Sequence, residues 1–354
     1  MSPRRDDGLR RLLSGALPFP ETGGVFLMDT GLAFLAKEAE AAVGSDRLVL
    51  TERYLDRIAL FGERHVLHRA RPEPESGDMV ILAAGRERLR LFRDLQDLAA
   101  RVGENGRVAL FGTKRDGMIP AEALLREHGR VTLSLQRGGA RLLIVAPLAG
   151  EPDWNLETPP DHFNVEARAV RLRVRALPGV FSWNRLDEGS AFLLDSLKVR
   201  EGDRLLDLGC GNGVVAAALL TEGVVSSATL CDSDALAVEA AEDTLALNGH
   251  EAEVLADDAG TGLPRKSFDL VACNPPYHQG GSQERGTGQR MIAESARVLD
   301  ARGRLVLVAP RFHDHGPELV RHFRSSGILR ENSSYRIWQG ARPRRRPLPS
   351  EGSS

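Results

Sequence analysis

Four consecutive residues, Asn274, Pro275, Pro276 and Tyr277, have types and spacing that suit chemistry on an amine. They follow the apolar residues 271–273, and the two prolines remove backbone donors and restrict the residue before each of them. The side-chain oxygen of Asn274 and the carbonyl of Pro275 can accept both N–H bonds of an exocyclic amine and hold its nitrogen in line with a methyl donor. The Tyr277 ring offers a flat face for a planar base. An isolated sequence of this kind also fits a simple proline-rich turn.

A second pattern consists of three glycines, Gly209, Gly211 and Gly213, which follow Asp207 in the stretch DLGCGNG. Glycines at the end of a strand let the backbone approach a ligand and leave the next helix N-terminus open. The dinucleotide fingerprint would require its third glycine at Val214, so that motif is not matched. The observed spacing after an acidic strand residue is typical of S-adenosylmethionine-dependent methyltransferases, although a glycine-rich turn alone also fits other nucleotide folds.

Carboxylates follow the next two predicted strands. Asp232 is placed to bind a ribose hydroxyl pair, although a carboxylate here could instead cap a helix, a role that Ser233 or Asp234 fills more naturally. Asp257 and Asp258 could accept a hydrogen bond from an adenine amine, or could be solvated charges in a loop.

These residues must be positioned by an alternating series of strands and helices. Strands are expected at 203–211, 226–232, 252–258, 268–274 and 304–310, and helices at 214–223, 233–250 and 290–303. Such alternation predicts a parallel sheet with helices on both faces. Because ligands bind at the carboxyl ends of parallel strands, the glycine turn and the Asn274 motif should face one another there.

The first and second halves of the chain have similar sequences, which indicates two related domains. Residues 24–36 echo residues 179–194, and the segment from Asp78 echoes the segment from Asp269, with a shorter interval between these anchors in the first half. A duplication whose first copy lost the segment with the glycine loop explains this, as would chance similarity of two α/β domains. We therefore predict a degenerate domain at 1–150, a linker at 151–168, a catalytic domain at 169–340 and a basic, disordered tail at 341–354.

Composition limits the other possibilities. The 354 residues carry a net charge of −2, so nucleic acid would have to be bound by a local patch. The three cysteines are odd in number and far apart, which argues against disulfides and zinc and favours a reducing cytoplasm. The chain contains no apolar run near the ~20 residues of a membrane span and no secretory signal, so we expect a cytoplasmic protein that uses no metal.

Residues 177–308 resemble a known family through the stretches LPGVFSWNRLDEGSAFLLDSL, LLDLGCGNGVV, LCDSDALAVEAAEDTLALNG and FDLVACNPPYHQG. In order and spacing these are similar to the ribosomal RNA small-subunit guanine-N2 methyltransferases of the RsmC/RlmG type. The resemblance implies two tandem Rossmann-like class I methyltransferase domains in an α/β fold. The N-terminal one would be truncated and would lack the cofactor loop. It also implies S-adenosyl-L-methionine as cofactor and the guanine N2 amine of ribosomal RNA as methyl acceptor.

By that resemblance, Asp207, the three glycines, Asp232 and Asp258 bind the cofactor, together with Asn274. Phe181, Asp187, Gly189 and Ser190, which precede the first strand of the second half, would help to close the cofactor pocket or pack their helix. Asn274, Pro275, Pro276 and Tyr277 form the catalytic wall, with tyrosine where many relatives have phenylalanine. The stretch APRFHDHGPELVRHF departs from the family pattern after the fifth strand, which leaves the substrate-side loop undefined.

The sequence therefore predicts an N-methyltransferase of ribosomal RNA, acting on small-subunit RNA or the small subunit itself, and a monomer. The same chemistry would serve an enzyme that methylates a protein glutamine or a DNA or RNA adenine. A third hypothesis is a non-catalytic RNA-binding assembly factor that retains the fold. The intact Asn274 and glycine turn argue against that hypothesis.

Overall fold

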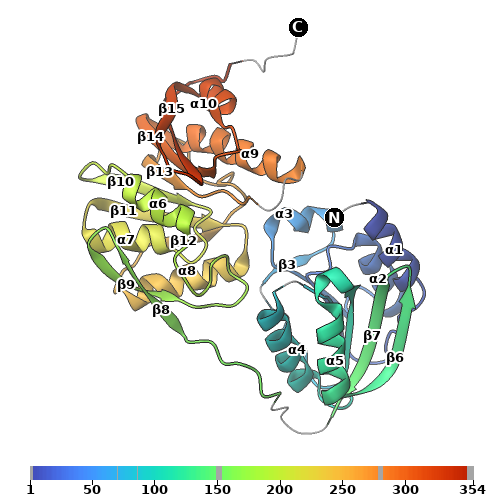
Figure 1. Ribbon diagram of the computed structural model, residues 1–354. Helices are drawn as coiled ribbons and strands as arrows, with labels where there is room; N and C mark the ends of the chain where they lie inside the picture. Colours follow the sequence, from blue (N-terminus) through green and yellow to red (C-terminus); the bar gives the residue numbers. More distant parts are fainter. Residues whose placement is uncertain (1–2, 70, 86, 149–153, 278–281, 349–354) are drawn as a thin grey trace. The chain divides into compact units, whose positions relative to one another are not determined.

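A computed structural model of the chain describes residues 3–69, 71–85, 87–148, 154–277 and 282–348 (Figure 1). The chain divides into two compact units, Met1–Pro159 and Pro160–Ser354, called unit 1 and unit 2 below. The division falls inside the segment that the sequence indicated as a linker.

Unit 1 contains a seven-stranded sheet with helices on both faces. Its elements are α1 (Pro3–Leu13), β1 (Val25–Met28), α2 (Ala33–Val43), β2 (Leu48–Glu52), α3 (Leu55–Ile58), a 3₁₀ helix (Ala59–Phe61), β3 (Val66–His68), β4 (Met79–Ala83), α4 (Arg88–Val102), β5 (Arg107–Thr113), a 3₁₀ helix (Lys114–Asp116), α5 (Met118–His128), β6 (Gly129–Arg137) and β7 (Ala140–Pro147).

Unit 2 contains a second seven-stranded sheet and a two-stranded one. Its elements are β8 (His162–Ala167), β9 (Val170–Arg175), α6 (Glu188–Ser196), β10 (Asp203–Leu208), α7 (Val214–Glu222), β11 (Val225–Asp232), α8 (Ala235–Leu247), β12 (Glu253–Ala256), β13 (Phe268–Cys273), α9 (Ser282–Val298), β14 (Leu299–Pro310), α10 (Gly316–His322), β15 (Phe323–Glu331) and β16 (Tyr335–Pro343).

The two large sheets have the same topology. Their strand orders are β3-β2-β1-β4-β5-β7-β6 and β12-β11-β10-β13-β14-β16-β15, and only the last two strands of each run antiparallel to their neighbours. This arrangement confirms the predicted tandem α/β fold.

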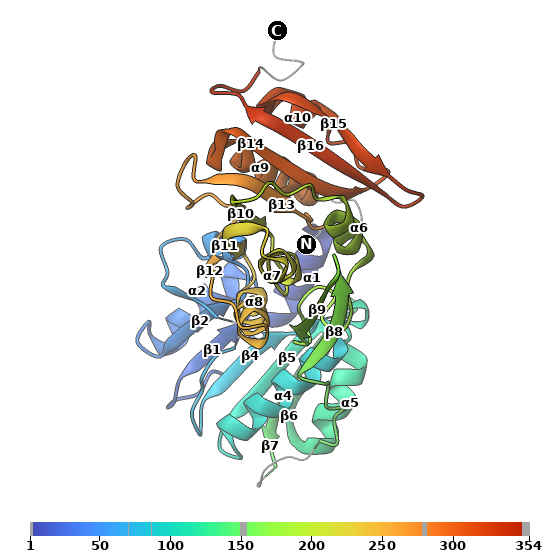
Figure 2. The ribbon, with the colours of Figure 1, turned by 90° about the vertical axis from the view of Figure 1, so that its left-hand side faces the viewer.

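The central strands of unit 2 are apolar because both faces of the sheet are covered. Leu205 and Leu270 lie in a core shared with α6, α7 and α8, whereas Leu206 and Val271 lie in a core shared with α9 and α10. Figure 2 shows α9 and α10 beside β14, β15 and β16. Local signals fix the helix ends: the Asp234 side chain accepts the Leu236 N–H at the start of α8, and α7 ends at Gly223 with a positive φ of 74°.

Strand register shows which residues of the two units correspond. Met28, the last residue of β1, pairs with Thr51 and Leu82, and Leu208, the last residue of β10, pairs with Cys231 and Cys273. The residues that come one position later therefore correspond as well: Asp29 with Gly209, Glu52 with Asp232, and Ala83 with Asn274.

This register confirms one sequence echo and corrects the other. The segments from Asp78 and Asp269 form the equivalent strands β4 and β13. Residues 24–36, however, form β1 and the start of α2, whereas residues 179–194 form a loop and α6 ahead of β10. The glycine turn was therefore not removed with a lost segment: unit 1 retains a strand–helix turn there and has Asp29-Thr30-Gly31 where unit 2 has Gly209-Cys210-Gly211, so the first glycine is replaced and the second is kept.

Several predicted boundaries also differ from the structure. The second part of the 151–168 segment forms β8, because Val165 packs into the core of unit 2 against Leu172 on the paired strand β9; residues 151–153 lie outside the described residues. The helix expected at 290–303 begins earlier, at Ser282, and ends at Val298, since Leu299 already pairs with β13 as a strand.

The predicted disordered tail also begins too early. β16 continues to Pro343, which pairs with Phe323, and the Arg344 backbone N–H donates to the His322 carbonyl at 2.8 Å. Backbone pairing thus orders the first part of the 341–354 segment. Residues 349–354 lie outside the described residues.

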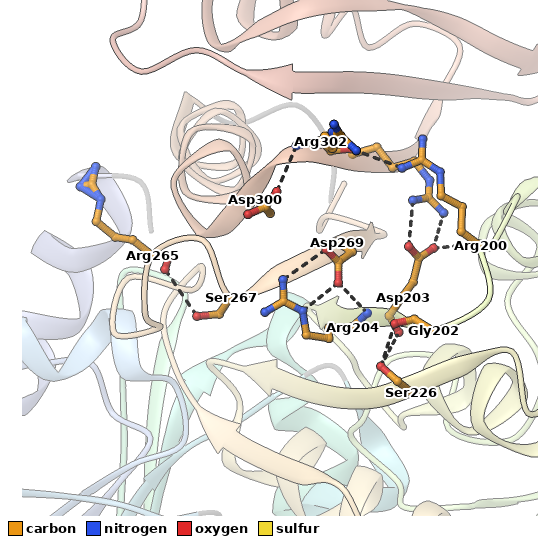
Figure 3. A network of polar contacts seen from close by, with 11 residues as sticks. Arg200, Gly202, Asp203, Arg204, Ser226, Arg265, Ser267, Asp269, Asp300 and Arg302 are labelled. Carbon is orange, nitrogen blue, oxygen red and sulfur yellow. Dashed lines mark hydrogen bonds and ion pairs between the residues drawn. The ribbon is translucent and has the colours of Figure 1, made fainter.

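Ion pairs close the amino ends of the central strands of unit 2 (Figure 3). Buried Arg304 of β14 pairs with buried Asp203 of β10 at 2.5 Å. Arg204 of β10 contacts Asp269 of β13 through two nitrogens, at 2.8 and 3.2 Å, and this pairing holds the pKa of Asp269 below its usual value. These contacts link three strands at one edge of the sheet, and the opposite edge carries the predicted site.

Candidate functional site

The carboxyl ends of β10 and β13 bring half of the predicted catalytic and cofactor-binding residues into one pocket; Gly213, Asp232, Asp258, Pro275, Pro276 and Tyr277 are not among the described residues that line it. Its lining includes the predicted residues Phe181, Ser190, Asp207, Gly209, Gly211 and Asn274. They come from the loop before α6, from α6, from the glycine turn and from the end of β13. Residues that are far apart in the chain, and that the sequence analysis had assigned to one site, therefore line the same pocket.

The glycine turn has a backbone that favours glycine. Gly209, Gly211 and Gly213 have φ values of 73°, 54° and 74°, in the left-handed region. A Cβ on Gly213 would lie 3.1 Å from the Ala241 backbone, so this glycine allows α7 to pack closely against α8. A Cβ on Gly211 would meet nothing within 4 Å. The turn thus exposes its backbone to the pocket.

Asp232 holds the glycine turn from the neighbouring strand. Its Oδ2 accepts the Gly211 N–H at 3.0 Å, and its Oδ1 accepts the Asp234 N–H at 3.0 Å. The carboxylate therefore fixes the turn and also the first turn of α8. Helix capping proper belongs to Asp234, as the sequence indicated.

Asp207 lies beneath the turn and is only 4% exposed. Its Oδ2 accepts the Ala216 N–H at 3.1 Å, which ties the strand to the first turn of α7. Burial raises the pKa of Asp207 to about 7, and the nearby charge of Asp232 adds to the shift.

Asp258 is held by an arginine. Its two oxygens accept from the Arg290 guanidinium at 2.6 and 3.0 Å, and it is not among the described residues that line the pocket. The adenine contact predicted for Asp258 therefore stays a prediction, and it would have to share this carboxylate with Arg290.

Asn274 has its side chain oriented by α6. Its Nδ2 donates to Asp187 Oδ2 at 3.1 Å and to Ser190 Oγ at 3.0 Å. Both amide hydrogens are thereby used, which directs the amide oxygen to a different partner. Asp187 also caps α6 by accepting the Ser190 N–H at 2.8 Å.

Gly189 allows this approach of α6. A Cβ there would lie 3.0 Å from Asp187 Oδ2 and 3.3 Å from the Tyr335 ring. The sequence assigned Asp187, Gly189 and Ser190 to the cofactor pocket or to packing of their helix. The hydrogen bonds of Asp187 and Ser190 with Asn274 were missed, although these two residues have the spacing of a helix cap.

Tyr277 is fixed from two sides, while Pro275 before it is buried and Pro276 is exposed. The Tyr277 hydroxyl donates to the Val308 carbonyl at 3.0 Å and lies 3.1 Å from His315 Nε2. Burial lowers the pKa of His315 to about 4, so its ring is neutral near pH 7. Since the Tyr277 hydroxyl donates to Val308, its contact with His315 fits the tautomer that carries the hydrogen on Nε2. Burial also raises the pKa of Tyr277. Nothing in the sequence pattern had indicated His315.

The three cysteines are buried, and burial raises the pKa of each thiol, which keeps them protonated and unreactive. Among the residues that the structure describes, no cluster of three or more His, Cys, Asp or Glu side chains could hold a metal ion. No helix in the described part of the chain is long and apolar enough to cross a membrane.

The strand order, the glycine turn and the Asn274 motif define a class I methyltransferase that uses S-adenosylmethionine. Residues 171–339 match the family described as "Methyltransferase small domain". The glycine turn with its open backbone and the Asp232 carboxylate are suited to such a cofactor.

Relatives of known name are more specific. A "Ribosomal RNA small subunit methyltransferase C" from Stutzerimonas stutzeri (strain A1501) is 38% identical over 70% of this chain and 74% of its own length. One of the same name from Hahella chejuensis (strain KCTC 2396) is 33% identical over 77% and 80%. The chain belongs to the ribosomal RNA small subunit methyltransferase C family.

A solved structure shares the fold over almost the whole chain. This T. thermophilus 16S rRNA N2 guanine methyltransferase, in complex with AdoMet and guanosine, matches with a TM-score of 0.77 and 21% identity. The match covers 96% of this chain and 92% of that one, so the tandem arrangement of two methyltransferase-like units is common to both.

Proposed function

We propose that this protein transfers a methyl group from S-adenosylmethionine to the exocyclic N2 amine of a guanine in small-subunit ribosomal RNA. The observation that carries the proposal is the orientation of the Asn274 amide by Asp187 and Ser190, beside the glycine turn. The names of the relatives indicate small-subunit ribosomal RNA, and the name of the structural neighbour indicates guanine N2.

In unit 2 one group of residues would bind the cofactor and another would bind the guanine that accepts the methyl group. S-Adenosylmethionine supplies an electrophilic methyl group on its sulfonium. Gly209, Gly211 and Gly213 would hold it against the open turn, with Asp232 beside the ribose. Asp207 would support the turn from below, Phe181 would close the pocket, and Asp258 would face the adenine together with Arg290.

The acceptor is held by the Asn274 motif. The Asn274 side-chain oxygen, which has no hydrogen-bond partner among the described residues, and the Pro275 carbonyl would each accept one N–H of the guanine amine. Two acceptors fix the nitrogen lone pair toward the methyl group, and the rigid prolines hold them there beforehand. After transfer the cationic nitrogen loses a proton readily, so no strong general base is needed. Tyr277 would stack on the guanine.

Unit 1 would be a non-catalytic copy that supports the fold and helps to bind RNA. Register places Asp29, Glu52 and Ala83 where unit 2 has Gly209, Asp232 and Asn274. We further propose that the protein acts as a cytoplasmic monomer, because two internal units already provide the pairing of a dimer. Its partner would be the small ribosomal subunit or its RNA.

The test is transfer of labelled methyl from S-adenosylmethionine to unmodified small subunits, large subunits, free ribosomal RNA and a release-factor protein. Label on small-subunit RNA that digests to N2-methylguanosine is the expected result, and the Asn274→Ala variant should lose it. Label on the protein or on an adenine would identify another N-methyltransferase. Cofactor binding without any labelled acceptor would indicate an assembly factor.

A further inference from the structure

Phe312 is exposed in a way that apolar packing does not explain. It is 82% exposed, more than any other large hydrophobic side chain among the described residues. It lies two residues after the end of β14, and β14 is the parallel neighbour of β13, the strand that Asn274 directly follows. An exposed ring at the carboxyl edge of the sheet is therefore close to the proposed acceptor site.

A row of aromatic rings connects Phe312 to the catalytic motif. The Phe312 and His313 ring centroids are 4.7 Å apart, and those of His313 and Tyr277 are also 4.7 Å apart. Tyr277 is fixed at the inner end through its hydroxyl, and Phe312 is the outer end. The spacing is that of aromatic pairs that contact one another, so the rings support each other's orientation.

The backbone holds the outer rings in place. The His313 N–H donates to the Pro310 carbonyl at 2.9 Å, and the Gly316 N–H donates to Asp314 Oδ1 at 2.9 Å. His315 anchors the far side of the loop through Tyr277 and by accepting the Leu319 N–H at the start of α10. The loop thus presents Phe312 in a prearranged position rather than leaving it to find one on binding.

We propose that Phe312 and His313 form a platform on which a second base of the RNA strand stacks, next to the guanine held at Asn274. The inference rests on the proposed function and extends it to the neighbouring nucleotide. Single-stranded RNA is commonly recognised by aromatic rings that stack on splayed bases. Arg311, which precedes the ring, is exposed and cationic, with its guanidinium 3.7 Å from Glu331, and a cation beside the ring favours a nucleotide with its phosphate over an apolar protein surface.

The test measures methyl transfer to small subunits that lack the modification, with Phe312→Ala, Phe312→Leu and Phe312→Trp. Phe312→Ala should raise KM for the RNA substrate about 5- to 150-fold, the range of one base–aromatic stack, with kcat nearly unchanged. Phe312→Leu should behave like Phe312→Ala because it is apolar but has no ring, whereas Phe312→Trp should retain the wild-type KM. S-Adenosylmethionine affinity should stay the same in all three.

A second readout is independent of turnover. Tryptophan emission of the Phe312→Trp variant should be quenched by a single-stranded RNA fragment containing the methylated guanine, beyond any quenching of the wild type. The quenching should disappear when the bases flanking that guanine are replaced by abasic sites. Wild-type KM in Phe312→Ala, or unchanged emission with RNA bound, would overturn the platform and leave the proposed function intact. If the wild type methylated no ribosomal substrate, the proposed function would fail, whatever the emission showed.

Discussion

The two units contain sheets of the same topology but differ in the residues at the carboxyl ends of the central strands. In unit 2 the three register positions at that edge hold Gly209, Asp232 and Asn274, and Gly209 and Asn274 line an open pocket. In unit 1 the same positions hold Asp29, Glu52 and Ala83. The comparison isolates what a site needs beyond the fold.

Charged side chains fill the edge in unit 1. Asp29, with a positive φ of 50° where Gly209 has 73°, accepts the Arg53 backbone N–H at 2.8 Å and pairs with Arg90 at 3.1 Å. Arg90 also pairs with buried Asp94 at 3.1 Å, and Arg53 is only 1% exposed. A space that is open to a ligand in unit 2 is thus occupied by the protein's own ion pairs.

The difference teaches that the fold and the site depend on separate residues. The apolar strand interiors of both units, such as Met28 with Leu82 and Leu208 with Cys273, form equivalent layered cores. The edge residues lie at the last position of a strand or directly after it, and they can change without disturbing the sheet. Substitution at the edge, rather than loss of a segment, accounts for the missing cofactor turn in unit 1.

The largest effect that tests this comparison of the two units is expected at Asn274, which directly follows β13 in unit 2. Asn274→Ala should lower kcat about 10²- to 10³-fold, the scale on which a preorganised polar contact to the reacting group acts. The matched change at the equivalent position, Ala83→Asn, should leave kcat within about twofold. Both are measured by methyl transfer at saturating substrate, with melting temperature as the folding control. A tenfold change in the Ala83→Asn variant would mean that unit 1 takes part in catalysis.

The next effect concerns the cofactor. Asp232→Asn keeps the size of the side chain but removes its charge, and it should weaken S-adenosylmethionine binding about 10- to 100-fold by calorimetry. Glu52→Gln, the same change at the equivalent position of unit 1, should leave the affinity and the stoichiometry of one cofactor per chain unchanged. Equal affinity in the wild type and the Asp232→Asn variant would remove the ribose contact from the proposed site.

Glu52 also gives a pH-dependent prediction about stability. Burial, and then the charge of Asp29, raises the pKa of Glu52 from 4.5 to about 7, and its Oε2 has no hydrogen-bond partner in the described part of the chain. Because the folded pKa is raised, the contribution of this group to stability is complete below about pH 4.5 and is lost as the pH rises through 7. Glu52→Gln should therefore gain about 1–3 kcal/mol over the wild type at pH 8, and little at pH 4.5.

Urea unfolding at both pH values measures this difference. Asp207→Asn is the counterpart in unit 2, because the pKa of Asp207 is also raised to about 7. It should show the same direction of pH dependence but also alter cofactor binding, since Asp207 lines the pocket. A difference between Glu52→Gln and the wild type that did not change with pH would show that the Glu52 carboxyl titrates normally.

The sequence alone was enough to locate the motifs that are rich in proline or glycine, because these residue types occur in a small number of backbone conformations. Asn274-Pro275-Pro276-Tyr277 and the three glycines could be placed at strand ends because proline and glycine restrict the backbone in known ways. The equivalence of Asp29 with Gly209 could not be predicted from the sequence, because residues 24–36 share more residue types with residues 179–194 than with the segment that is structurally equivalent. Strand register decides equivalence, and it becomes visible only when the sheet is formed.

Contacts between segments that are distant in the chain could not be predicted from the sequence either. His315 reaches Tyr277 across 38 positions, and Ser190 reaches Asn274 across 84, so no local pattern connects them. Asp258 was placed at the end of its strand, but its pairing with Arg290 on α9 depends on how that helix packs. Such partners are set by tertiary structure.

The smallest expected effect comes from α6, the helix that precedes the first strand of the large sheet in unit 2. In unit 1 the helix in that place in the chain, α1, packs on β7 through buried leucines, whereas α6 packs on β14 and also orients Asn274. Ser190→Ala removes one of the two acceptors for the Asn274 amide and leaves Asp187 in place. A single neutral hydrogen bond contributes about 0.5–1.5 kcal/mol, so kcat should fall about 2- to 12-fold.

The control lies on the same helix. Ser196 is also buried, but its hydroxyl donates to the Phe192 carbonyl at 2.7 Å, within α6. Ser196→Ala should therefore lower the melting temperature about as much as Ser190→Ala and leave kcat unchanged. S-Adenosylmethionine affinity should remain within about twofold in both variants, because the effect of Ser190 acts through the amide of Asn274. A parallel loss of kcat in the two variants would mean that α6 supports the site by packing alone. A loss confined to Ser190→Ala would show that the amide needs both acceptors to present its oxygen.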